Sequence, residues 1–170
     1  MRTISWKYRC YPRDEAPLLD ILARAHRYRN ILTGIERERR AQAAANLPAD
    51  PTKDQKSASW KLATAASHVA IREARSRSGC YWGTYLTAEN AADYQRKEMR
   101  ATPRFRAWDQ TGTLSVQIQH GMPVEDLLAC QSTQLRLNHA GQLSLRIGSQ
   151  GRAPIWAHAG VVMHRPLPAL

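Results

Sequence analysis

The sequence predicts an α+β protein, in which one β-strand is followed by a helical insert and then by a small antiparallel barrel or sandwich. Apolar and polar residues alternate at the start of the chain, recur at helical spacing over residues 13–102, and alternate again in short stretches over residues 103–170. With 170 residues, 43% of them hydrophobic, the chain is long enough for one domain or for two small lobes that share a core.

The first strand is predicted from alternation near the N-terminus. Its apolar residues are Ile4, Trp6, Tyr8 and Cys10, and the polar residues between them are Thr3, Ser5, Lys7 and Arg9. This pattern is typical of a half-buried strand, so we expect Lys7 and Arg9 on a polar, basic face. Tyr11 to Arg13 ends the strand, and Asp14 is placed to cap the helix that follows.

Three helices are expected after this strand. The apolar residues of the first helix fall at helical spacing: Leu18, Leu22, Ala25, Tyr28, Leu32 and Ile35. Two prolines break the chain at 46–51, and a second helix is expected over 56–77 with Trp60, Ala63 and Ala66 at helical spacing. Ser78 and Gly79 close this second helix, and a third helix begins at 81–85 and ends at Arg100.

The remaining residues predict short strands. Alternating stretches lie at 114–119, 134–138 and 143–147, with further apolar stretches at 155–157 and 161–163. Turns are expected at 139–141 and at 148–151, where glycines separate the alternating stretches. Regular spacing of this kind favours an antiparallel barrel or sandwich.

Charge is the strongest compositional signal. The chain has 25 Lys and Arg against 14 Asp and Glu, a net charge of +11 and a pI near 10.2. Most of the basic residues are arginines, whose planar guanidinium binds phosphate oxygens bidentately and stacks on bases. Anionic lipid, or a surface that is merely basic, would also fit this charge. Nucleic acid is favoured because the arginines cluster and aromatic residues lie between them.

Catalytic and metal-binding patterns are missing from the sequence. The six histidines and three cysteines have no metal-ligand spacing, and there is no glycine-rich phosphate loop or nucleophile elbow. Residues 107–170 hold only three acids, too few for two-metal phosphodiester cleavage. We therefore expect no enzyme activity, no cofactor and no metal. No apolar run is long enough to span a membrane, and the scattered cysteines favour a cytoplasmic protein.

The candidate nucleic-acid-binding residues form four groups. They are Arg24, Arg27 and Arg29 on the first helix; Tyr81, Thr84 and Tyr85 at the start of the third; the basic stripe Arg96, Lys97, Arg100, Arg104 and Arg106; and Lys7, Arg9, Arg136, Arg146 and Arg152 on strands. The stripe is the strongest phosphate candidate. The aromatic residues of 81–85 either stack on bases or seat the third helix on the barrel. Tyr28 and Trp82 are expected in the core, and Tyr81 and Thr84 on the surface.

Several motifs resemble a known family. Trp6-Lys-Tyr-Arg-Cys-Tyr-Pro12, followed by His26-Arg-Tyr-Arg-Asn30, resembles the opening of TnpB-like proteins and of the miniature type V CRISPR effectors. Gly79-Cys-Tyr-Trp-Gly-Thr-Tyr-Leu86, Pro103-Arg-Phe-Arg106 and His164-Arg-Pro-Leu-Pro168 extend the resemblance over nearly the whole chain.

This resemblance implies a wedge domain, which is an oligonucleotide-binding-like β-barrel, interrupted after its first strand by a helical recognition lobe. Residues 1–12 and 103–170 would form the wedge, and residues 13–102 the lobe. The resemblance also implies that wedge and lobe together hold guide RNA and contact the target-adjacent DNA duplex, in a protein of prokaryotic or phage origin.

The family continues into further wedge strands and a RuvC-like nuclease domain, whereas this chain stops at Leu170. We therefore expect binding without cleavage, and an open barrel edge covered by a protein partner or by self-association. Two alternatives remain: an interaction or inhibitor protein that imitates this front end, and one half of a split effector completed by a partner chain.

Overall fold

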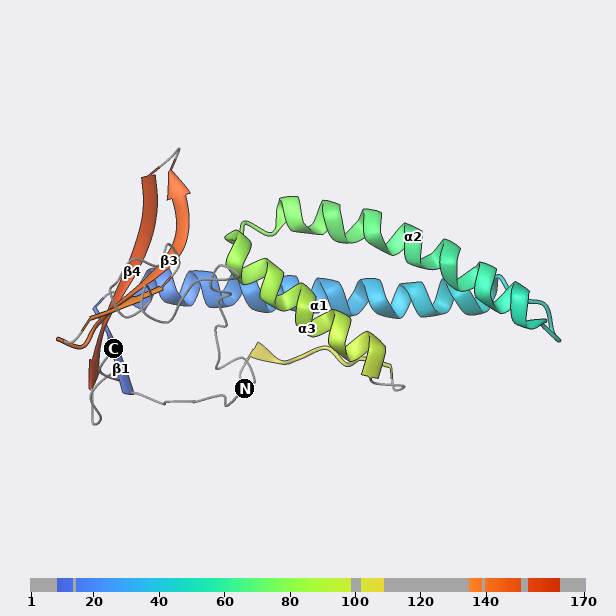
Figure 1. The fold of residues 1–170 in the computed structure, drawn as a ribbon, viewed down its shortest axis with the longest axis horizontal. Helices are drawn as coiled ribbons and strands as arrows, with labels where there is room; N and C mark the ends of the chain where they lie inside the picture. Colours follow the sequence, from blue (N-terminus) through green and yellow to red (C-terminus); the bar gives the residue numbers. More distant parts are fainter. Residues whose placement is uncertain are drawn as a thin grey trace, which may run out of the picture. The chain divides into compact units, whose positions relative to one another are not determined.

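A computed structural model describes residues 9–13, 15–98, 102–108, 135–138, 140–150 and 153–162. The described residues contain three helices and four strands, which confirms the α+β class (Figure 1). The chain divides into two compact units, one made of residues 1–21 with 116–170 and the other of residues 22–115. We call them the sheet unit and the helical unit.

Helix α1, Glu15–Ala45, is the longest element of the chain. Its buried side chains include Ile21, Tyr28, Leu32 and Ala43, which are separated by seven, four and eleven residues and so share one face. The predicted first helix is therefore confirmed, and Gly34 lies within it without ending it.

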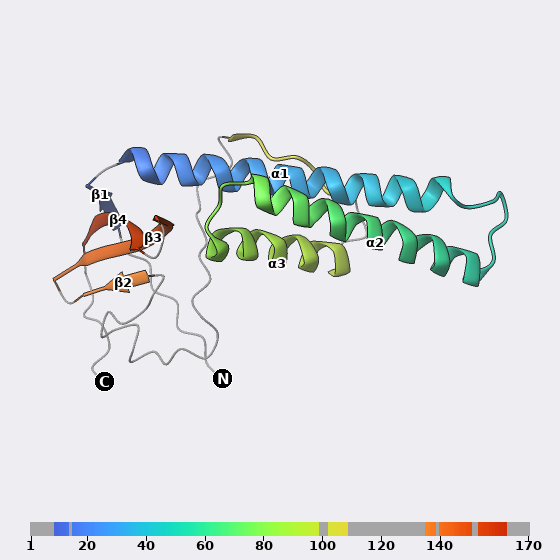
Figure 2. The same cartoon turned by 90° about the horizontal axis from the view of Figure 1, so that it is seen from above.

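Helix α2, Lys53–Arg77, runs back along α1 after the break at 46–51 (Figure 2). It begins three residues earlier than predicted because Thr52 and Gln55 form a capping box. The Thr52 hydroxyl accepts from the Gln55 amide at 3.3 Å, and the Gln55 side chain accepts from the Thr52 amide at 2.9 Å.

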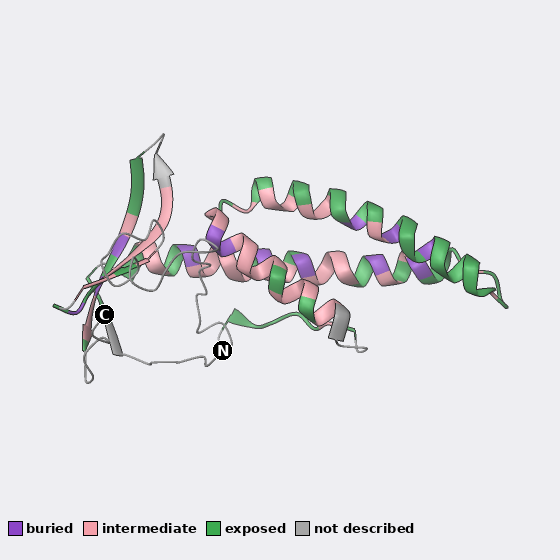
Figure 3. Cartoon of the chain, viewed as in Figure 1, coloured by how far each residue is buried: buried purple, intermediate pink, exposed green. Residues whose placement is uncertain are grey.

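Small residues form the contact between α1 and α2. Ser59, Ala63 and Ser67 are the buried residues of α2, and the Ser59 hydroxyl donates to the Ala43 carbonyl at 2.7 Å. Figure 3 shows buried positions recurring along both helices. The placement of Trp60 with the buried residues of this helix was wrong: its side chain is 39% exposed, because it lies beside the buried stripe and packs against the Arg39 guanidinium, 4.7 Å from the ring centre.

Helix α3, Trp82–Glu98, follows a tight connection through Gly79. The φ of Gly79 is +63°, a left-handed conformation that favours glycine after a helix. A Cβ atom at this position would also lie 3.0 Å from an Arg24 guanidinium nitrogen. The Gly79 carbonyl accepts from that guanidinium at 3.1 Å, which ties the connection to α1.

The sheet unit contains β1 (Arg9–Pro12), β2 (Leu135–Leu137), β3 (Gln142–Gln150) and β4 (Ala153–Val162). The strands are antiparallel in the order β1-β4-β3-β2. Within the described residues they form an open sheet, so an oligonucleotide-binding-like barrel is not confirmed. The strand expected at 114–119 lies outside the described residues.

The two faces of the sheet differ in polarity. One face pairs Leu143 with Ala159 and Leu145 with Ala157, and both alanines are buried. On the opposite face the pairs are Ser144 with His158 and Arg146 with Trp156. This alternation is the one predicted from the sequence.

Both predicted turns mark places where the chain reverses. The turn before β3 ends at Gly141, which has a φ of +73°. The reversal expected at 148–151 comes later than predicted, because β3 continues to Gln150 and pairs there with Ala153 of β4. Gly148 therefore lies within β3, at the register shift that follows Arg146, instead of opening the turn.

Candidate nucleic-acid interface

A cavity of about 540 Å³ opens in the helical unit, lined by α1, α3 and the segment 102–108. We call it the arginine cavity. Five of its lining residues are Arg29, Arg40, Arg96, Arg104 and Arg106, and the others are Leu32, Thr33, Glu36, Ala92, Gln95, Pro103 and Phe105. It thus combines five guanidinium groups with one carboxylate.

Helical spacing explains why α1 contributes so many polar groups to this cavity. Arg29, Thr33, Glu36 and Arg40 are separated by four, three and four residues, so they form one stripe next to the buried face. The sequence-based prediction grouped Arg29 with Arg24 and Arg27, which are near it along the chain, and so missed the stripe that joins Arg29 to Arg40.

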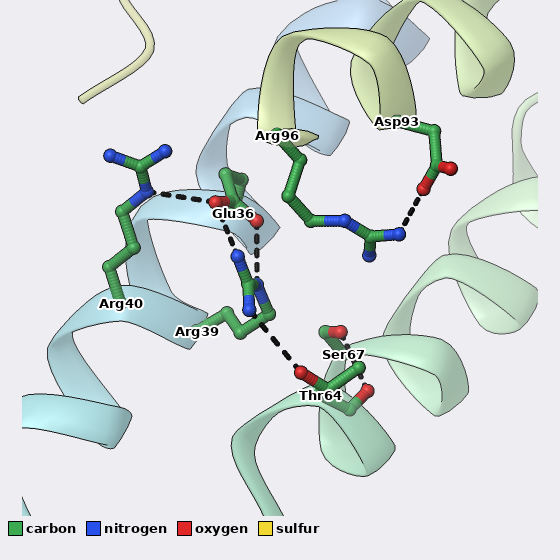
Figure 4. A network of polar contacts seen from close by, with 7 residues as sticks. All are labelled: Glu36, Arg39, Arg40, Thr64, Ser67, Asp93 and Arg96. Atoms are coloured by element: carbon green, nitrogen blue, oxygen red, sulfur yellow. Dashed lines mark hydrogen bonds and ion pairs between the residues drawn. The ribbon is translucent and has the colours of Figure 1, made fainter. Parts of the chain in front are cut away.

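The single acid that lines the cavity is neutralised from its own helix. Arg39 and Arg40 each place a guanidinium nitrogen within 2.8 Å of a Glu36 carboxylate oxygen (Figure 4). Although burial raises the pKa of Glu36, the hydrogen bonds from these two arginines outweigh it, and the pKa lies below its usual value. Arg39 also donates to the Thr64 hydroxyl at 3.3 Å, which links α1 to α2.

Arg96 is likewise engaged with an acid of its own helix, because its guanidinium pairs with Asp93 (Figure 4). The two side chains are 24% and 41% exposed, so solvent partly screens the pair, and pairs one turn apart on a helix contribute little stability. Arg96 can therefore turn toward an anion in the cavity at small cost.

The other three arginines of the cavity, Arg29, Arg104 and Arg106, have no ion pair with an acid among the described residues. Burial and the neighbouring charge of Arg106 lower the pKa of Arg29, which still remains charged at neutral pH. Two like charges held this close repel each other. A phosphate between them would remove that repulsion.

The structure brings together three residues of the predicted basic stripe, namely Arg96, Arg104 and Arg106. Arg100 and the side chain of Lys97 lie outside the described residues. From the first-helix group, Arg29 joins this cavity, whereas Arg24 bonds to Gly79 and Arg27 is exposed elsewhere on α1.

The residues at the start of α3 are buried or half-buried. Thr84 is 3% exposed, so its expected surface position was wrong; Gly83 beside it is also buried, and this turn faces inward. The Tyr85 ring lies 4.9 Å from the Arg75 guanidinium. Tyr81 and Trp82 are both half-buried, and the Trp82 indole donates to the Tyr81 hydroxyl at 2.7 Å.

Three helices meet at Tyr28, Arg75 and Glu89, which we call the helix junction. Tyr28 is 1% exposed, as predicted for a core residue, and its hydroxyl donates to Glu89 on α3. Arg75 of α2 donates to the same Glu89 oxygen at 2.9 Å. Burial, followed by the hydrogen bond to Glu89, raises the pKa of Tyr28 well above its usual value.

Two predicted residues of the sheet, Arg136 and Arg146, lie on its polar face. The Arg136 guanidinium sits 4.4 Å from the centre of the Trp156 ring, an arrangement suited to cation–π attraction. His158 and Ser144 share a hydrogen bond of 3.0 Å on this face. Lys7, Arg152 and the side chain of Arg9 lie outside the described residues.

The described residues offer neither a metal site nor a membrane-spanning helix. No group of three or more His, Cys, Asp or Glu in this part of the chain is placed to hold a metal ion. Across the same residues, no helix combines the length and the apolar character needed to cross a membrane.

Comparison with known proteins finds a partly similar sequence. The sequence is 27% identical over 121 residues to the CRISPR-associated DNA-binding protein Cas12m of Thermanaerosceptrum fracticalcis, a match that covers 59% of this chain and 20% of the relative. The chain thus spans a small part of that protein's length. No family model matches, and no solved structure matches significantly. The similarity supports an origin related to CRISPR effectors.

Proposed function

We propose that this chain binds nucleic acid, with phosphate groups held in the arginine cavity. The observation that carries the proposal is that Arg29, Arg104 and Arg106 face one cavity without an ion-paired acid among the described residues. Guanidinium groups form charge-assisted, bidentate hydrogen bonds with phosphate, and the bound counterions that are released add to the affinity.

Similarity to the relative supports nucleic acid as the partner. That protein is named as a CRISPR-associated DNA-binding protein. We propose that this chain has the wedge and recognition-lobe role suggested by its motifs, and that it holds guide RNA and contacts the target-adjacent duplex. In such a complex the protein recognises backbone and shape, while base pairing by the guide supplies sequence specificity.

We also propose that the chain binds without cleaving. Two acids at or beside the cavity, taken from the part of the chain that the structure describes, support this, since Glu36 is paired with two arginines and Asp93 with a third. Carboxylates engaged in this way are not arranged for the two-metal chemistry of phosphodiester cleavage. Incubation of a labelled target with guide RNA and Mg²⁺ should leave the target intact, and metal-dependent cutting by the purified chain would contradict this.

The polar face of the sheet is a second surface that fits the same partner. Arg136 stacked on Trp156 presents a flat cation of the kind that packs against a base. This contact lies in the sheet unit and is proposed independently of the arginine cavity.

The test compares two variants with the same change in charge. Arg29→Gln, Arg104→Gln and Arg106→Gln together remove three positive charges from the cavity, and Lys53→Gln, Lys56→Gln and Lys61→Gln remove three from the exposed surface of α2. Binding of an RNA hairpin and of a DNA duplex is measured by fluorescence anisotropy.

We expect the cavity variant to lose affinity by about a thousandfold, since three phosphate contacts are lost and each costs about tenfold. The lysine variant should lose only a few-fold, because it weakens general electrostatic attraction alone. Equal losses in both variants would mean that net charge drives binding and would refute the cavity as the site.

A further inference from the structure

The segment 102–108 follows one stripe of α1, next to the stripe that lines the arginine cavity. Trp108 packs edge-on against His26 with ring centres 5.3 Å apart, and Phe105 lies 5.3 Å below the Arg37 guanidinium. The Phe105 ring also reaches the surface of α1 at Gly34. The segment therefore runs antiparallel to α1, with its later residues nearer the start of the helix.

Asn30 makes the central contact between α1 and residues 102–108. Its side-chain oxygen accepts from the Arg106 amide at 3.0 Å, and its side-chain nitrogen donates to the Arg106 carbonyl at 3.0 Å. Both backbone groups of one residue are thus bound by one side chain, in the way that a neighbouring strand would bind them. The His26 ring nitrogen Nε2 donates to the same carbonyl at 2.9 Å.

These contacts hold Arg106 near Arg29, where the two positive charges repel each other. Arg106 faces Arg29 across the arginine cavity, and the charge of Arg106 contributes to the lowered pKa of Arg29. Without a restraint, an exposed segment of this kind would relax and move the two guanidinium groups apart. A restraint on the backbone fixes the direction of the side chain without neutralising it.

We infer that Asn30, assisted by His26, is a positioning residue that holds Arg104 and Arg106 opposite Arg29, so that the phosphate site is formed before nucleic acid arrives. The inference rests on the proposed function and adds to it the device that sets the geometry of the site. Because the site is already formed, binding does not have to order the segment, and affinity is gained without further contacts.

The test uses the fact that the Asn30 side chain carries no charge. Asn30→Leu keeps the net charge and removes both hydrogen bonds, so a loss of affinity cannot come from a lost charge. We expect the affinity for the RNA hairpin to fall about tenfold, because at least one charge-assisted contact between an arginine and a phosphate becomes misaligned. Gln42→Leu is the matched control, because Gln42 is an amide of the same helix whose side chain donates to Glu38.

A double-mutant cycle separates positioning from general stability. In a background of Arg104→Gln with Arg106→Gln, the side chains that Asn30 would position are gone, so Asn30→Leu should change affinity by less than about twofold. Amide exchange of residues 102–108 should be faster in Asn30→Leu than in wild type, and unchanged in Gln42→Leu. Asn30→Ala is made in parallel, in case the leucine variant folds poorly.

Two results would overturn the inference. If Asn30→Leu and Asn30→Ala bind like wild type, or weaken binding equally in both backgrounds, Asn30 does not act through the arginines. If instead Arg104→Gln with Arg106→Gln binds like wild type, the proposed phosphate site itself fails. The two failures are therefore distinguished within one set of measurements.

Discussion

The helix junction and the arginine cavity are both built from α1 and α3, and both contain arginine, yet they treat its charge in opposite ways. At the junction, Arg75 is matched by Glu89, which also accepts from Tyr28. In the cavity, Arg29 faces Arg106. The first arrangement satisfies the charge within the fold, and the second leaves it available to a partner. The number of arginines alone would not separate these two cases.

The largest effect is expected at the junction. Tyr28→Ala removes a side chain that is 1% exposed, so it leaves a void and strips Glu89 of one hydrogen-bond donor. Replacing a buried aromatic residue in this way costs about 3–5 kcal/mol of unfolding free energy. Denaturant titration measures the loss.

Tyr28→Ala also separates the helix junction from the arginine cavity, if nucleic-acid binding is measured under conditions where the variant remains folded. Affinity per folded molecule should then match wild type, because Tyr28 does not line the arginine cavity. A change in stability below about 1 kcal/mol would contradict the role given to the junction.

The second largest effect is expected at alkaline pH, where the helix junction should contribute less to the free energy of unfolding. The pKa of Tyr28 is raised by folding, so the unfolded chain loses this proton first as the pH rises. The stabilising contribution is complete below about pH 10, the usual tyrosine pKa, and falls by up to about 1.4 kcal/mol per pH unit above it. The difference in unfolding free energy between wild type and Tyr28→Phe isolates this effect from other titrations. A difference that does not vary between pH 9 and 11 would contradict it.

The smallest effect is expected beside the cavity. Gly34→Ala adds a Cβ atom 3.9 Å from the Phe105 ring, an ordinary van der Waals distance. Alanine favours a helix over glycine by up to about 1 kcal/mol, so α1 should gain stability while the arginines keep their places. Thermal unfolding measures the gain. A melting temperature below that of wild type would mean that residues 102–108 pack too closely against α1 to accept the added methyl group.

Periodicity in the sequence predicted much of the fold. The three helices, the buried Tyr28, the polar face with Arg136 and Arg146, and the turn at Gly141 all follow local patterns. Trp60 and Thr84 were misplaced because burial depends on which helix faces pack together, and spacing along one helix does not determine that.

The candidate site was only partly predictable. The basic stripe led to Arg96, Arg104 and Arg106 because they are close in sequence. Arg40 and Asn30 were missed, since their roles depend on a segment more than sixty residues away packing along α1. A four-three-four spacing of polar residues from Arg29 to Arg40 was the signal that could have found that side of the cavity.

The salt dependence of binding tests the phosphate site most directly. The logarithm of the association constant for a DNA duplex is measured against the logarithm of salt concentration, for wild type and for the two triple-glutamine variants. If Arg29, Arg104 and Arg106 each contact a phosphate, the slope of the cavity variant should be shallower than wild type by about 2.7, at about 0.9 per contact. The slope of the lysine variant should change much less than that of the cavity variant. Equal slopes for wild type and the cavity variant would contradict the account.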